Sequence, residues 1–324
     1  MATVSKVAVV LGAGGTVGHA FHAGVLAALH EVIGWDARQA DVLVGTSAGS
    51  IVASMLRAGM PAVDLAARAT GTPLSPAGAA VVARAGLGPP RPRPTRPSGR
   101  GGGMSSPARL AQAMRAPWAV SPGSLAAALL PAGRVSTEHI AMPFDALYGD
   151  RWPSAPLWIV AVQLDTGRRV VFGQDGAPPA TPAEAIQASC AIPAFFEPAV
   201  IGGTRYVDGG VHSTTNADLV GAEQPDLVLI SAPMSAARGA VRMGPASAMR
   251  QVVRLSLARE IAALRGRSIT VMTFQPTAAD LAEMGTDSLD PAVVGPVARQ
   301  VRATTTARLS RADVKQRLAA LRPT

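Results

Sequence analysis

Short apolar runs alternate with segments of helical periodicity through the first sixty residues. Lys6–Leu11 is a β-branched apolar run that predicts a buried strand, and Val42–Val44 predicts a second. His19–Ile33 and Ile51–Arg57 follow these runs and carry apolar residues at helical spacing. A strand–loop–helix unit that occurs twice in succession is typical of an α/β protein with a parallel sheet.

The alternation resumes after residue 156. The later apolar runs predict strands at Leu157–Gln163, Arg169–Phe172, Asp226–Ile230 and Ile269–Phe274. Helical spacing predicts helices at Pro182–Ser189, Met249–Leu264 and Val297–Leu321, with two shorter pieces at Ala108–Met114 and Ser124–Leu130. We therefore expect a three-layer α/β fold with a central, mostly parallel sheet flanked by helices.

One segment breaks this pattern. Residues 87–105 are dominated by proline and glycine, with arginines between them, and predict a flexible insertion. Candidate chemistry lies on both sides of it, so we expect a single catalytic domain over residues 1–324 rather than two domains. Residues 236–324 are expected to form a C-terminal helical part packed on that domain. The arginines of the insertion could also touch anionic lipid head groups.

Composition narrows the classes of protein. Apolar residues make up 48% of the 324 positions, enough for a full core, and the formal net charge is +9. The arginines are scattered and lack interleaved aromatic residues, so nucleic acid is not an expected partner, whereas an anionic membrane surface is compatible with the charge. The single cysteine, Cys190, excludes an intrachain disulfide and is expected to be a buried apolar residue. We expect a cytoplasmic protein, with peripheral membrane contact as an alternative.

The clearest chemical motif is Gly45-Thr46-Ser47-Ala48-Gly49, which has the form G-x-S-x-G between a predicted strand and a predicted helix. A nucleophile on so sharp a turn needs glycines two residues away on each side, because side chains there would clash. The alternative is an ordinary turn in which Ser47 caps the helix.

A glycine-rich loop, Gly12–Gly18, directly follows the first predicted strand. Its free backbone N–H groups could hold a phosphate or the oxyanion of an acyl-transfer intermediate. A dinucleotide fingerprint would need glycine where Val17 stands, and a P-loop would need lysine in place of His19. The loop therefore favours an oxyanion site.

The base is the remaining question. Asp208-Gly209-Gly210 places an aspartate at a glycine turn, where it could deprotonate a serine or simply accept local backbone hydrogen bonds. Among the five histidines only His212 follows Asp208, and it lies too close in sequence for the usual separate loop of a catalytic triad. The histidines therefore suggest no triad, and a Ser–Asp dyad is the expectation. No His/Cys/Asp spacing suggests a metal, and no cofactor is expected.

In order, these motifs resemble the patatin-like phospholipases, a family that includes bacterial serine acyl hydrolases. The segments that carry the resemblance are the glycine loop, Gly45–Gly49, Leu164–Gly167 with Val170–Phe172, Ala188–Pro198 and Asp208–Gly210. The loop departs from the family pattern at Ala13, where a glycine is usual, and at Val17, where a basic residue is usual. The change at Val17 removes a charge that could meet a phosphorylated head group.

The resemblance implies a serine lipid acyl hydrolase that cleaves acyl esters of lipids or phospholipids through an acyl-enzyme. Ser47 would be the nucleophile and Asp208 its base, with the amides of Gly14, Gly15 and Thr16 as the oxyanion hole. A thioesterase or acyltransferase using the same dyad is one alternative. A catalytically weak lipid-binding regulatory protein and a nucleotide-binding protein are others.

Overall fold

A central sheet of eight strands organises the chain in the computed structural model, which describes residues 6–88, 105–106, 129–131, 133–240 and 245–318. The strand order is β5-β6-β3-β2-β1-β7-β8, and β4 pairs with β3. The strands are β1 (Val7–Leu11), β2 (Val42–Thr46), β3 (Leu157–Gln163), β4 (Arg169–Phe172), β5 (Ala199–Ile201), β6 (Thr204–Asp208), β7 (Leu227–Ser231) and β8 (Thr270–Phe274).

Five neighbouring strands, β3, β2, β1, β7 and β8, run parallel, whereas β4, β5 and β6 join through antiparallel pairings. Parallel strands require crossover connections, and helices such as α1 between β1 and β2 supply them. The α-helices of the described residues are α1 (Gly15–Ile33), α2 (Ala48–Arg57), α3 (Ala62–Thr70), α4 (Pro76–Arg84), α7 (Glu138–Tyr148), α8 (Pro182–Ser189), α9 (Pro245–Arg265), α10 (Ala278–Met284), α11 (Val294–Leu309) and α12 (Ala312–Arg317). The expected mostly parallel α/β fold is confirmed.

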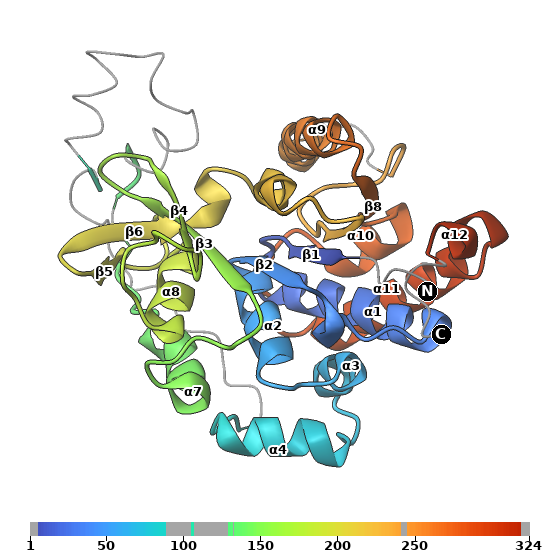
Figure 1. The fold of residues 1–324 in the computed structure, drawn as a ribbon, viewed down its shortest axis with the longest axis horizontal. Coiled ribbons are helices and arrows are strands. Elements are labelled where there is room, and N and C mark those ends of the chain that lie inside the picture. The colour runs from blue at the N-terminus through green and yellow to red at the C-terminus, as the bar shows by residue number, and fades with distance from the viewer. Residues whose placement is uncertain (1–5, 89–104, 107–128, 132, 241–244, 319–324) are drawn as a thin grey trace.

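Alternate residues of the strands enter two different cores. Along β1, Val7, Val9 and Leu11 face the larger core, which also contains residues of α1, α2, α8 and α11. Ala8 and Val10 face a smaller core that α9 completes through Leu257 and Leu264. Figure 1 shows α9 across the sheet from α1 and α2. Because β1 is buried on both faces, it is a continuous apolar run rather than an alternating one.

The described residues correct some predicted boundaries. The predicted helix over Val297–Leu321 is two helices, α11 and α12, because Arg311 adopts an extended conformation between them. The predicted strand Ile269–Phe274 is confirmed as β8, which pairs with β7 at one end of the sheet. The predicted helix Ala108–Met114, most of Ser124–Leu130 and most of the 87–105 insertion lie outside the described residues. No helix in the described ranges is both long and apolar enough to cross a membrane.

The close packing of α1 on α11 predicts a stability effect. A Cβ on Gly24 of α1 would lie 2.8 Å from the Ala298 carbonyl oxygen of α11. Gly24→Ala should therefore lower the free energy of unfolding by about 1–2 kcal/mol, because overpacking outweighs the better helix propensity of alanine. Urea denaturation measures this change. Gly88→Ala is the control and should be neutral, because an added Cβ at Gly88 would meet nothing within 4 Å. Equal stability of the two variants would contradict the prediction.

Candidate active site

Ser47 lies on a strained turn between β2 and α2. Its backbone has φ 54° and ψ −119°, a left-handed conformation that non-glycine residues seldom adopt. Ser47 occupies the N-cap position of α2, but its side chain makes no capping hydrogen bond. The alternative interpretation of Ser47 as a helix cap is therefore wrong.

The two glycines of the pentapeptide are needed for close packing. A Cβ on Gly45 would lie 2.4 Å from the Ser50 Cα, and one on Gly49 would lie 1.9 Å from the carbonyl oxygen of Leu11. Helix α2 therefore packs against its own strand and against β1 at distances that only glycine allows. These contacts hold Ser47 at the carboxyl end of the sheet.

Asp208 reaches Ser47 because two strands share one edge of β3. β2 pairs with β3 up to Val160, and β6 pairs with the next residues, with Asp208 opposite Ala161. Since β4 pairs with Ile159–Val162 along the other edge, β2 and β6 must follow one another on the same side. Their carboxyl ends therefore meet, and Ser47 follows one of them while Asp208 ends the other.

The Asp208 carboxyl group is buried near the Ser47 side chain. Burial raises its pKa from the ordinary 3.8 to about 6, and the Ser47 side chain and the hydrogen bond from the Gly210 amide (2.7 Å) oppose that rise. Asp208 thus accepts a local turn hydrogen bond and also lies beside the serine.

The segment Ala188–Pro198 holds both residues in place. The Ser47 N–H donates to the Ser189 hydroxyl (2.9 Å), and that hydroxyl donates to the Val160 carbonyl at the junction of β2 and β6 (2.7 Å). The Asp208 N–H donates to the Ala191 carbonyl (3.0 Å). The sequence marked this segment as similar to the family but gave no sign of these contacts, which join residues more than 140 positions apart in the case of Ser47 and Ser189.

The glycine loop leads into the N-terminus of α1 beside Ser47. The Val17 N–H donates to the Ser288 carbonyl and the Gly18 N–H to the Gly14 carbonyl. The amides of Gly14, Gly15 and Thr16 precede these and have no acceptor within the helix. A Cβ on Gly18 would lie 3.3 Å from the Ala48 Cβ, so the N-termini of α1 and α2 adjoin and both favour negative charge nearby.

Val17 faces away from this loop. Its side chain is buried in the larger core with residues of α1 and β1. In this chain the position that is usually basic in the family is therefore a packing position rather than a head-group contact.

His22 holds the glycine loop through a hydrogen bond to the Gly12 carbonyl. The ring is buried, and burial lowers its pKa to about 3, so the imidazole is neutral. Nε2 lies 2.8 Å from the Gly12 carbonyl, which only accepts, so Nε2 carries the proton and Nδ1 accepts from the Ser231 hydroxyl at 2.7 Å. Within the described chain, no hydrogen bond joins a histidine side chain to Ser47 or Asp208.

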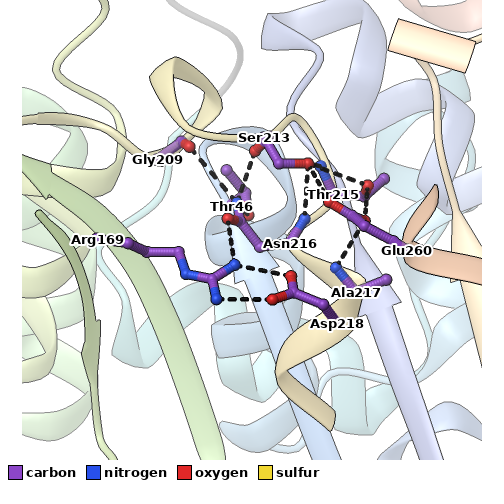
Figure 2. Close-up of polar contacts among 9 residues, drawn as sticks. All are labelled: Thr46, Arg169, Gly209, Ser213, Thr215, Asn216, Ala217, Asp218 and Glu260. Atoms are coloured by element: carbon purple, nitrogen blue, oxygen red, sulfur yellow. Dashed lines mark hydrogen bonds and ion pairs between the residues drawn. The ribbon is translucent and has the colours of Figure 1, made fainter. Parts of the chain in front are cut away.

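A buried polar network connects the nucleophile strand to the turn after Asp208 (Figure 2). The Asn216 amide donates to the Thr46 hydroxyl (3.1 Å), the Ser213 carbonyl (2.6 Å) and the Gly209 carbonyl (3.5 Å). Asn216 itself has φ 54°, a conformation that asparagine tolerates well. The sequence analysis did not identify Asn216 as a site residue. The one feature of the sequence that could have suggested it is its position eight residues after Asp208.

Charged groups secure the far side of the same network. Arg169 of β4 donates to the Asn216 side-chain oxygen and pairs through two nitrogens with the Asp218 carboxylate at 2.7 Å each. Glu260 of α9 accepts from the Ser213 and Thr215 hydroxyls and from the Ala217 N–H. Asn216 is therefore anchored by β4, and the turn that carries it is anchored by α9.

Cys190 is buried beside this site. Burial and the nearby Asp208 charge raise the pKa of the thiol well above its usual value, which keeps it protonated and unreactive. Throughout the described ranges, no three His, Cys, Asp or Glu side chains gather closely enough to hold a metal ion.

The segments that build this site match one known protein family. The patatin-like phospholipase family model matches residues 9–76 and 150–220, which include the glycine loop, Ser47, Ser189 and Asp208. VipD from Legionella pneumophila is a similar solved structure, with a TM-score of 0.39 and 12% sequence identity over 93% of this chain and 67% of VipD. No curated protein sequence matches the chain. Over these two segments the chain is similar to the patatin-like phospholipases.

Proposed function

We propose that the chain is a serine lipid acyl hydrolase that acts through a Ser47–Asp208 dyad. The observation that carries the proposal is the meeting of the carboxyl ends of β2 and β6 on one edge of β3, which places Ser47 beside the buried Asp208 carboxyl. The family match supports lipid esters as the substrate class.

Each group has a defined role in this mechanism. Asp208 takes the hydroxyl proton as the Ser47 Oγ attacks the ester carbonyl carbon, and a tetrahedral intermediate forms. The amides of Gly14, Gly15 and Thr16 stabilise its oxyanion, an effect of about 3–4 kcal/mol for a single donor in other hydrolases. The intermediate expels the alcohol, which takes a proton from Asp208. Water, deprotonated by Asp208, then releases the acyl group and restores Ser47.

Removing either member of the dyad should abolish ester hydrolysis. Ser47→Ala and Asp208→Asn are expected to lower kcat on a nitrophenyl ester by about 10³-fold or more, because both act in the same proton transfer. A fluorophosphonate probe should label the wild type but not Ser47→Ala. The exposed Ser310 gives a matched control, Ser310→Ala, which should keep full activity. Unchanged turnover by Ser47→Ala would exclude this mechanism, and an unlabelled wild type would favour a regulatory lipid-binding protein.

The pH profile should show the ionisation of Asp208. As a base Asp208 must be deprotonated, so kcat/KM should rise with pH through about 6 and then level off. Steady-state kinetics on the nitrophenyl ester between about pH 4 and 9 measure the profile, with unfolding followed at the same pH values as the control. A limb centred near the ordinary carboxyl pKa of 3.8 would indicate a solvated base instead.

The same ionisation of Asp208 should lower the free energy of unfolding. Folded Asp208 holds its proton more tightly than the unfolded chain does, so the free energy of unfolding falls as the pH rises from about 4 to about 6. The difference between 3.8 and about 6 corresponds to about 3 kcal/mol. Asp208→Asn should therefore gain stability over the wild type at about pH 8 and gain little at about pH 4. Equal gains at both pH values would contradict the buried-charge explanation.

The Asn216 network should affect turnover more than binding. Thr46→Val removes the hydroxyl that Asn216 contacts and keeps the side-chain shape, so Ser47 loses one constraint. We expect kcat to fall about tenfold with KM nearly unchanged. Thr215→Val is the matched control, since Thr215 contacts Glu260 in the same network but neither Thr46 nor Gly209. It should lower stability and leave kcat near the wild-type value, whereas equal kcat losses in both variants would indicate a general packing effect.

A further inference from the structure

Helix α9 exposes an apolar stripe that its packing does not need. Met249, Val252 and Leu255 are 62%, 63% and 56% exposed and follow one another at intervals of three residues. Other positions of the helix, Val253, Leu257 and Leu264, are buried, and the last two belong to the smaller core. These three exposed side chains, which we call the α9 stripe, therefore form a second apolar side on a helix that needs only one.

The charged side chain within the stripe is cationic. Arg259 lies seven residues after Val252, on the same side of α9, and is exposed. Glu260, the one acidic residue of α9, accepts hydrogen bonds from Ser213 and Thr215 beneath the helix. An apolar stripe with an exposed arginine and no outward acid on its own helix is complementary to an anionic lipid surface. It is a poor match for a second copy of this chain, whose net charge is +9.

The stripe also connects to the candidate active site. Arg250 of α9 donates to the carbonyls of Pro233 (2.9 Å) and Ser235 (2.8 Å), in the loop that follows β7. The Pro233 ring packs against Gly14, where an added Cβ would lie 2.8 Å from it. Because β7 is parallel to β1 and β2, this loop lies at the same edge of the sheet as Ser47. Figure 1 shows α9 as the outer helix on its face of the sheet.

From this placement we infer that the α9 stripe, with Arg259, docks the protein on an anionic lipid surface. Docking there brings lipid esters to the edge of the sheet where the glycine loop and Ser47 lie. The choice of a lipid surface as the partner rests on the proposed function, but binding itself needs no catalysis.

Vesicle binding tests the inference. The variant combines Met249→Ser, Val252→Ser and Leu255→Ser. The control combines Met142→Ser and Val200→Ser, whose side chains are 64% exposed each on α7 and β5. Full-length proteins are sedimented with phosphatidylcholine vesicles that contain phosphatidylserine. The α9 variant should bind about tenfold more weakly or worse, since it loses three apolar groups that insert into the lipid, and the control should bind like the wild type.

Two further measurements define the outcome. Arg259→Gln should weaken binding and reduce its dependence on salt, whereas Arg254→Gln, on another side of α9, should change neither. All these variants should hydrolyse a soluble nitrophenyl ester at the wild-type rate. The inference would be overturned if the α9 variant still bound vesicles, or if the wild type bound none. It would also be overturned if the α9 substitutions changed only the oligomeric mass measured by light scattering and not vesicle binding. A wild type that binds through the stripe but lacks esterase activity would contradict the proposed function and leave the inference standing.

Discussion

One edge of β3 is occupied by two strands that approach from opposite directions, and the candidate active site depends on this arrangement. β2 leaves the edge after Val160 and β6 ends beside it at Asp208. A gap between two strand ends leaves backbone groups without sheet partners, and buried groups of this kind are costly. The Ser189 hydroxyl fills the gap, since it donates to the Val160 carbonyl and accepts from the Ser47 N–H. One small side chain therefore completes the sheet and positions Ser47.

The arrangement is stable only because neighbouring groups compensate for two unfavourable features. Ser47 has a left-handed backbone conformation, which costs about 1–3 kcal/mol, and Asp208 is a carboxylate in a buried position. Tight packing at Gly45 and Gly49 prevents the turn from relaxing. The hydrogen bonds of Asn216 hold the Thr46 strand and the Gly209 turn at a fixed separation. The strain is therefore located where Ser47 and the buried Asp208 carboxyl are held together.

The sequence predicted those features that are encoded locally. The β-branched runs identified β1, β3 and β7, and the two elbow glycines indicated a steric constraint that the packing around Leu11 and Ser50 displays. Helices α3, α4 and α7 were missed, because they have only 9, 9 and 11 residues and helices this short depend on tertiary packing. Ser189, Asn216 and His22 were missed as site residues for a different reason. Each acts through a partner distant in sequence, and such pairs have no local signature.

The buried position of Val17 changes where head-group recognition can arise. A basic side chain at the start of α1 could meet a lipid phosphate directly, but here that position packs in the larger core and its N–H is bound by the Ser288 carbonyl. The glycine loop therefore keeps its amides and lacks a side-chain cation at position 17. The exposed Arg259 supplies positive charge in another layer of the fold, on α9, which Arg250 joins to the loop over Gly14. In the proposed mechanism these two tasks are separate. The loop would stabilise an oxyanion without a fixed ion pair to the head group, and attraction to an anionic surface would come from α9, whose Glu260 also holds the turn after Asn216.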